Sequence, residues 1–303
     1  MNIVVIGSIN TDLVINTNRF PKIGETVSGN GFSVNCGGKG ANQAIAAAKL
    51  GGNVTFIGAV GNDENGNISI ANLNKSGVNT ENIKRTNVNT GVAVITVCNG
   101  DNSIILDSGA NDLVSTDIID KNKDIILGAD VVVMQLEIPI ETVSYAASIA
   151  RSGGVKVILN PAPVKEMPLE LLKNTDVLIL NETEAEFITK IYPDTNEKRT
   201  KCIEELRKLG VDTIILTLGG DGSLYTDKDD IKYQKAYKTT VVDTTAAGDT
   251  FIGAFCMRMN ENIDYAIKYS TVASSITVSR AGASKSIPTE SEVYELMDSE
   301  DNF

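Results

Sequence analysis

Two carboxylates, Asp243 and Asp249, enclose a short run of small residues that ends in Ala246, Ala247 and Gly248. A mostly apolar helical pattern follows over residues 250–257. Small residues let backbone N–H groups approach a ligand closely, and the start of a helix adds unpaired amides and a positive dipole end. The combination is typical of an anion site with a carboxylate at its mouth. Asp249 therefore either caps the helix or acts chemically beside a bound anion, and this stretch alone supports both interpretations.

The chain has 303 residues and no histidine. This composition excludes Ser-His-Asp and Cys-His catalysis as well as every histidine-ligated metal site. If the protein is an enzyme, we expect its base to be Asp or Glu. The formal net charge is −12, and no Lys/Arg cluster stands out. We therefore expect no nucleic-acid partner but a small molecule held by a local site.

The four cysteines, Cys36, Cys98, Cys202 and Cys256, form no CxxC pair, so we expect free thiols and neither disulfides nor zinc. The N-terminus begins at once with a strand pattern and shows no signal sequence. No apolar run reaches the length of about 20 residues that spans a bilayer. These features predict a cytoplasmic protein without a membrane partner.

Short apolar runs predict buried strands near 3–7, 54–60, 129–136, 155–160, 176–180 and 212–216. Helical patterns lie between or after them, near 43–50, 67–76, 141–151, 197–209, 250–257 and 264–279. The alternation predicts an α/β fold, with residues 1–303 as a single domain. We expect the last residues, 299–303, to be frayed.

Two segments interrupt this alternation, at about 13–36 and 90–107. Both alternate apolar and polar residues, and the second contains an Asn99-Gly100 turn signal that is typical of a hairpin. We expect the two segments to pair as one small β-sheet beside the main domain.

Polar side chains follow several of the buried strands, where open α/β sheets bind their ligands. Asn10 and Asp12 follow the first strand, and Glu137 follows the strand at 129–136. An ordinary turn, bonded to nearby backbone, is the alternative for the first pair. Asn181 and Glu184 follow the strand at 176–180, where helix capping competes with a role near phosphate and Mg²⁺.

A glycine-rich loop precedes the first helix and comprises Gly38, Lys39, Gly40, Ala41 and Asn42. It matches neither the Walker pattern nor the dinucleotide GxGxxG fingerprint, which argues against a dinucleotide oxidoreductase. Asn42 is expected either to cap the helix or to contact a ligand. A second such turn suits a nucleotide phosphate or a plain hairpin, and it consists of Thr217, Leu218, Gly219, Gly220, Asp221 and Gly222.

Taken in order, the motifs at 7–12, 37–42, 181–184, 217–222 and 243–249 resemble the PfkB-type carbohydrate kinases over nearly the whole chain. Within that family they are most similar to the members that phosphorylate ribose. The resemblance implies a Rossmann-like three-layer α/β/α core, a β-sheet lid that closes on the sugar, and a homodimer formed through the lid. It also implies ATP-dependent phosphorylation of D-ribose at its 5-hydroxyl, with deoxyribose, fructose or adenosine as the alternative substrates. A non-catalytic binder on the same fold is disfavoured, because it has no use for Asp249 as a base.

The resemblance also assigns residues. Sugar binding falls to Asn10, Asp12, Gly38, Lys39, Gly40, Ala41, Asn42, Glu137 and Asp249. Asp249 takes the proton from the sugar hydroxyl, and the anion hole consists of Ala246, Ala247 and Gly248. ATP is assigned to Asn181, Glu184, Thr217, Leu218, Gly219, Gly220, Asp221, Gly222, Gly248, Asp249 and Thr271, with Mg²⁺ held by the first two through water. K⁺ is assigned to Asp243, Thr245, Thr277, Arg280, Gly282 and Ser286, several of them through carbonyl groups. Thr271 and Ala281 match the family pattern less well than the rest.

Overall fold

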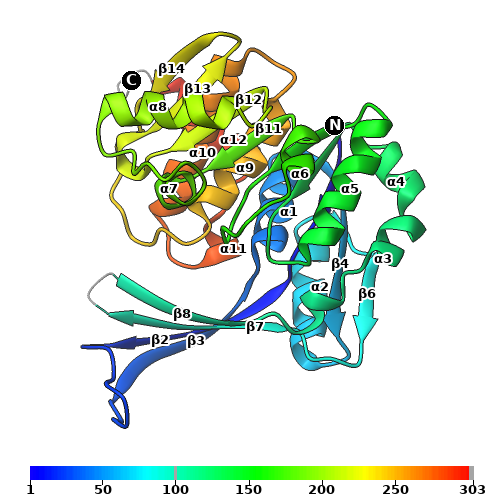
Figure 1. Ribbon diagram of the computed structural model, residues 1–303. Helices are drawn as coiled ribbons and strands as arrows, with labels where there is room; N and C mark the ends of the chain where they lie inside the picture. Colours follow the sequence, from blue (N-terminus) through cyan, green and yellow to red (C-terminus); the bar gives the residue numbers. More distant parts are fainter. Residues whose placement is uncertain (99–100, 300–303) are drawn as a thin grey trace.

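The computed structural model describes residues 1–98 and 101–299 (Figure 1). Its strands are β1 (Asn2–Ile6), β2 (Asn10–Thr17), β3 (Gly29–Gly37), β4 (Asn53–Gly61), β5 (Val78–Asn79), β6 (Ile83–Thr86), β7 (Gly91–Cys98), β8 (Asp101–Asp107), β9 (Val131–Met134), β10 (Lys156–Leu159), β11 (Val177–Leu180), β12 (Thr213–Thr217), β13 (Ser223–Asp227) and β14 (Asp230–Gln234). Its α-helices are α1 (Lys39–Lys49), α2 (Glu64–Lys75), α3 (Thr116–Lys121), α4 (Lys123–Leu127), α5 (Ile140–Ser152), α6 (Leu169–Lys173), α7 (Glu182–Thr189), α8 (Asn196–Arg207), α9 (Ala247–Arg258), α10 (Ile263–Val278), α11 (Ala283–Ser286) and α12 (Glu290–Asp298). Two short 3₁₀ turns, Gly109–Leu113 and Gly219–Asp221, complete the description.

The large sheet follows the order β14-β13-β12-β11-β10-β9-β1-β4-β5, with β6 also paired to β4. The strands from β12 to β5 run parallel, and β13 and β14 add an antiparallel edge. After β1 the chain passes to β4 on one side and later returns to β9 on the other. The sequence order therefore reverses between β1 and β9, which is where open α/β sheets bind ligands.

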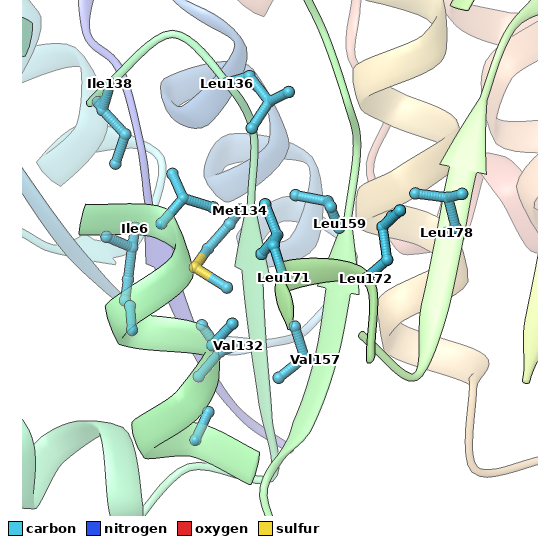
Figure 2. Close-up of a cluster of buried hydrophobic side chains, with 14 of the residues drawn as sticks. Ile6, Val132, Met134, Leu136, Ile138, Val157, Leu159, Leu171, Leu172 and Leu178 are labelled. Carbon is cyan, nitrogen blue, oxygen red and sulfur yellow. The ribbon is translucent and has the colours of Figure 1, made fainter. Parts of the chain in front are cut away.

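Alternate residues of the central strands enter two different cores, because successive side chains of a strand point to opposite faces. Ile6, Val132 and Met134 belong to the core covered by α3, α5, α6 and α8, part of which Figure 2 shows. Ile3 and Val133 belong to the opposite core, beneath α1, α9 and α10. The α/β/α layering predicted from the sequence is confirmed. No helix of the described residues has the length and hydropathy of a bilayer span.

The second sheet has four strands in the order β3-β2-β7-β8. It projects from the body below the half that carries α7, α9 and α11 (Figure 1). The two sequence segments do pair, as expected, but through a parallel contact between β2 and β7, with antiparallel contacts only at the outer strands. The predicted Asn99-Gly100 turn lies outside the described residues, as do 300–303 of the tail. We call this sheet the lid.

Predicted helix bounds differ from the observed ones by one to four residues, as for 43–50 against Lys39–Lys49 and 67–76 against Glu64–Lys75. Sequence patterning missed α3, α4 and α6, which have five or six residues each. Such short helices are too brief to show a helical period. The β14 strand was missed as well, because it is a polar edge strand without a clear apolar run.

Helix α9 packs closely on α1 because Gly253 faces it. A Cβ atom at Gly253 would lie 2.5 Å from the Cβ of Ala46 and 2.8 Å from the amide nitrogen of Ala47. Asp249 lies four residues earlier, so it shares this face of α9. The close packing therefore brings Asp249 to the first turns of α1, where Asn42 and Gln43 lie.

We predict that Gly253→Val separates the two helices and lowers the free energy of unfolding by about 1–3 kcal/mol, because added methyl groups overpack a filled contact. Urea denaturation measures the change. Gly220→Ala is the matched control, because a Cβ atom at Gly220 meets nothing within 4 Å. Equal stability of the two variants would contradict the prediction.

Candidate active site

Polar side chains from five parallel strands meet at the carboxyl edge of the large sheet. Asn10 follows β1, Glu137 follows β9, and Asn160 follows β10. Asn181 follows β11, and Thr217 ends β12. Parallel strands present their carboxyl ends on one edge of the sheet. Residues as far apart in sequence as Asn10 and Thr217 therefore lie in one site.

Glu137 is the centre of a hydrogen-bonded group at the end of β1 and β9. Its Oε2 atom accepts hydrogen bonds from the Ser8 hydroxyl at 2.5 Å, the Lys39 amide at 3.2 Å and Asn10 Nδ2 at 3.4 Å. Asn111 donates from Nδ2 to Asn10 Oδ1 at 2.7 Å and thereby orients that amide. The turn interpretation of Asn10 is therefore wrong, because its side chain bonds to distant side chains rather than to nearby backbone.

Asp12 lies buried on β2, and its carboxylate makes no hydrogen bond to any described residue. Burial and the neighbouring charges of Glu137 and Asp249 raise its pKa to about 7, although Lys39 opposes the rise. A buried carboxylate without a partner is costly in the free protein. This arrangement suits a ligand that brings hydroxyl donors.

The glycine-rich loop leads from the end of β3 into α1 and lies against the backbone that follows β1. Gly38 has φ +94°, and a side chain there would lie 2.8 Å from the backbone of Ser8 and Asn10. The Ala41 amide donates to the Ser8 carbonyl at 3.0 Å. Close backbone approach therefore explains this loop. Helix α1 begins at Lys39, so Asn42 is not its cap.

Asp249 is buried against α1. Its Oδ2 atom accepts from Asn42 Nδ2 at 3.1 Å, and its Oδ1 atom accepts from Gln43 Nε2 at 3.0 Å. Burial raises the pKa of Asp249, whereas Lys39 and the two amide donors oppose the rise. The capping interpretation of Asp249 is wrong, because Ala246 is the N-cap of α9 and no side chain caps the helix.

The start of α9 leaves backbone donors available. Ala246 adopts a left-handed conformation, with φ 62° and ψ 7°, which is uncommon for a residue other than glycine. The Ala247 amide donates to the Thr244 carbonyl at 3.2 Å. Within the described residues, the amides of Gly248 and Asp249 have no partner and remain free to bind an anion.

A cavity of about 220 Å³ lies beside these groups. Burial lowers the pKa of the Lys39 ammonium, but Asp249, Glu137, Glu184 and Asp12 more than offset this, so its pKa is raised and it stays protonated. The cavity wall consists of Lys39, Asn160, Ile179, Leu180, Asn181, Glu184, Thr217, Thr244, Ala246, Gly248, Asp249 and Ile252.

Asn181 and Glu184 do form a capping box at the start of α7. Both oxygens of the Glu184 carboxylate accept hydrogen bonds from Asn181, at 2.9 and 3.0 Å. The two residues also line the cavity. The capping and binding interpretations are therefore compatible. Burial raises the pKa of Glu184, which a nearby cation would counteract.

The remaining nucleotide-side assignments lie elsewhere. The 217–222 turn is a β12–β13 hairpin, as the plain interpretation predicts, and only Thr217 lines the cavity. The Asp221 side chain pairs with Arg199, and Leu218 is buried in the core. Thr271 lies in α10, donates its hydroxyl to the Ile267 carbonyl and does not line the cavity.

The six residues assigned to K⁺ do lie close in space. Asp243 accepts hydrogen bonds from the Thr245 amide and hydroxyl and, at 3.0 Å, from the Gly282 amide. Burial alone would raise the pKa of Asp243, but these bonds hold it below its usual value. Backbone bonds join Arg280 to Thr277 and Ser286 to Gly282, while the Arg280 side chain turns away to pair with Glu292.

Sequence reasoning missed five polar residues of this site: Ser8, Gln43, Asn111, Gln135 and Asn160. Asn160 ends a predicted buried strand, which is a usable signal. The others contact the site through partners 32 to 206 residues away in sequence. No pattern in the sequence indicates such pairs.

Comparison with known proteins agrees with this geometry. The profile described as "pfkB family carbohydrate kinase" matches residues 1–290. The chain belongs to the pfkB family of carbohydrate kinases. It is a sugar kinase of the ribokinase-like type, and the sequence-based assignment to this family is confirmed.

Three relatives show how this pfkB kinase compares in detail. The bifunctional ribokinase/ribose-5-phosphate isomerase A of Fructilactobacillus sanfranciscensis is 41% identical over 97% of this chain, which spans only 56% of that longer protein. The deoxyribokinase of Salmonella typhi is 36% identical over 95% of this chain and 96% of its own length. The structure of Arabidopsis thaliana ribokinase complexed with ribose and ATP is 34% identical and matches with a TM-score of 0.90, covering 98% of both chains.

We predict that Asp12→Asn stabilises the free protein more at pH 8 than at pH 5. The folded pKa of Asp12 is about 7, above the ordinary value of 3.8. The folded state therefore holds a proton that the unfolded state has lost, so stability falls as pH rises from about 4 to about 7. Asparagine removes this dependence.

Thermal melting at the two pH values measures the effect, with the exposed Asp229→Asn as control. An Asp12→Asn melting temperature that exceeds the wild-type value by the same amount at both pH values would contradict the assigned pKa.

Proposed function

We propose that this kinase transfers the γ-phosphoryl group of ATP to the 5-hydroxyl of D-ribose and forms D-ribose 5-phosphate. The observation that carries the proposal is the position of Asp249. Its carboxylate is buried, is held by two amide donors and adjoins the free amides of Gly248 and Asp249 on the wall of the cavity. A base beside an anion-binding helix start is what phosphoryl transfer to a hydroxyl requires.

Asp249 accepts the proton of the sugar hydroxyl as the hydroxyl oxygen bonds to the γ-phosphorus. The bond between that phosphorus and the β,γ-bridging oxygen breaks, and ADP leaves with the electron pair. The free amides at the start of α9 stabilise the charge on the transferred group. Lys39 remains protonated, which suits both the anionic phosphate and the surrounding carboxylates.

Oxygen ligands on the cavity wall suit Mg²⁺, which neutralises phosphate charge when it is bound. Glu184 and Asn181 are of the type that this ion prefers, and both line the cavity. Their oxygens already take part in the capping box, so contact through water fits better than direct coordination. No cluster of three or more acidic or cysteine ligands occurs among the described residues, which agrees with this arrangement.

The segment around Asp243 offers only oxygen ligands, which suits K⁺. We assign that ion to the Asp243 carboxylate and to backbone carbonyls at Thr245, Thr277, Arg280 and Gly282, with Ser286 beside them. When bound, K⁺ supplies a fixed positive charge near the start of α9. The K⁺ residues contact this helix directly, because the Thr277 hydroxyl lies 2.9 Å from the hydroxyl of Thr250 in the first turn of α9.

Asn10, Asp12 and Glu137 supply the acceptors for sugar hydroxyls, on the lid side of the site. The A. thaliana relative is described in complex with ribose and ATP, which favours ribose. A relative of similar identity is a deoxyribokinase, so deoxyribose is the second candidate.

The test measures ADP release over ribose, deoxyribose, fructose and adenosine, with K⁺ present and absent. We expect ribose to give the highest kcat/KM and K⁺ to raise it. We further predict that Asp249→Asn binds ATP but loses about 10²–10⁴-fold in kcat, because only the base is removed. The exposed Asp229→Asn is the control.

Turnover of another substrate without turnover of ribose would overturn the ribose assignment. Activity of Asp249→Asn within about threefold of wild type would overturn its role as base.

We also propose a homodimer that forms through the outer face of the lid. The cross-strand row Val34, Leu13, Val94 and Ile105 lies on one face, because paired residues share a face of a sheet. Asp12 points to the other face, since it is next to Leu13. Val34, Val94 and Ile105 are 52%, 42% and 71% exposed, so a contiguous apolar row faces outward.

We predict that Ile105→Lys yields a monomer in sedimentation velocity, because a lysine cannot be buried unpaired in an apolar interface. Ile104→Lys is the matched control, since Ile104 is 54% exposed but lies on the opposite face. A dimer in the first variant, or a monomer in the wild type, would contradict the assigned interface.

A further inference from the structure

Two buried glutamines lie behind the Asp249 carboxylate, and the function proposed above assigns no role to the pair they form. Gln43 lies in α1, one residue after Asn42, and Gln135 follows the last residue of β9. Gln43 is 1% exposed and Gln135 is fully buried. Neither lines the cavity, whereas Asp249 does. They therefore lie on the protein side of the base, where Gln43 contacts Asp249 and Gln135 contacts Gln43.

The hydrogen bonds form a chain of fixed direction. Gln135 Nε2 donates to Gln43 Oε1 at 2.6 Å, and Gln43 Nε2 donates to Asp249 Oδ1 at 3.0 Å. Gln43 Nε2 also lies 3.4 Å from Asn160 Oδ1. An ionised carboxylate only accepts hydrogen bonds, so the amide nitrogen of Gln43 must face Asp249 and its oxygen must face Gln135.

Gln135 makes the other orientation of Gln43 unfavourable. If the Gln43 amide rotated by a half turn, its oxygen would face the Asp249 carboxylate and its N–H group would face the N–H group of Gln135. Both contacts would then be repulsive, and the burial of both side chains raises the cost of the lost hydrogen bonds. The side chain of Gln135 is itself confined, because its Oε1 atom lies against Gly7, where a Cβ atom would approach it to 2.1 Å.

We propose that Gln43 and Gln135 are positioning residues for the catalytic base. Gln135 fixes the amide of Gln43, and Gln43 holds one oxygen of Asp249 so that the carboxylate stays ionised and aimed at the sugar hydroxyl. Asn42 holds the other oxygen from the neighbouring position on α1. This inference rests on the proposed function, because it presumes that Asp249 is the base.

The Gln43–Gln135 pair helps Asp249 to meet two opposing requirements. A base must be dry to act on a hydroxyl without wasting ATP on water, but dryness favours its protonated, inactive form. The charged groups around Asp249 are Lys39 on α1, Glu137 after β9, Asp12 on β2 and Glu184 on α7. Three of these four are acidic and do not help to keep Asp249 charged. A donor that cannot flip favours the ionised carboxylate at no cost in net charge.

The experiment compares Gln43→Met, Gln135→Met and the double variant with wild type, each as the full chain. Methionine keeps a similar length without an amide. We expect both single variants to move the acid limb of the kcat–pH profile upward by about one pH unit, because a hydrogen bond to the charged form is lost. We expect KM for ribose to stay within about threefold, because neither residue lines the cavity.

The double variant is decisive. If Gln135 acts only through Gln43, the double variant shifts the acid limb no further than Gln43→Met alone. Asn122→Leu is the control for loss of a buried amide, since Asn122 is buried and donates only to the Ile118 carbonyl, away from the site. We expect its profile to match wild type.

The outcomes separate the two proposals. An active Asp249→Asn variant overturns the proposed function itself. An inactive Asp249→Asn with unshifted profiles in both methionine variants overturns only the positioning role. Additive shifts in the double variant, or a shift from Gln43→Met alone, overturn the link from Gln135 through Gln43. If Gln43→Met does not fold, the Gln135→Met profile still tests the inference, because that residue does not touch Asp249.

Discussion

The contact between α1 and α9 is the constraint on which the site depends. Gly253 lets the two helices approach closely, and Asp249, one turn earlier, then reaches Asn42 and Gln43. The same approach sets the free amides of the α9 start beside the carboxyl edge of the sheet. The proposed base and the proposed anion site thus share one helix end, so their relative position is set by local geometry rather than by a flexible loop.

The electrostatics of the site follow from this packing. Asp12, Glu137, Glu184 and Asp249 gather around one cation, Lys39, so the free site has an excess of buried negative charge. Such an arrangement is unfavourable in the free protein, and the raised pKa of Asp12 is one result. In the proposed function, substrate hydroxyls and cations reduce this unfavourable charge. Functional sites commonly contain a locally unfavourable arrangement of this kind, and the stability of the surrounding fold compensates for its cost.

Much of the fold could be predicted because parallel sheets bury both faces and therefore produce continuous apolar runs, such as Val131–Met134 and Val177–Leu180. The lid was found through its alternating residues, but the parallel pairing of β2 with β7 was not. No residue of β2 or β7 indicates that these two strands are neighbours or that they pair in parallel. Short helices such as α4 were missed because one turn shows no period.

The sequence by itself indicated the chemistry: without histidine, a carboxylate is the expected base, and the ordered motifs indicated a sugar kinase. The tertiary structure decided which interpretation of each polar residue holds. Asp249 is not a cap, Asn42 does not cap α1, and Asn181 with Glu184 is both a cap and part of the cavity wall. It also revealed Gln43 and Gln135, whose partners lie 206 and 92 residues away in the chain. The reason is physical: a residue type limits what a side chain can do, but burial and the direction of its hydrogen bonds exist only after distant segments have packed together.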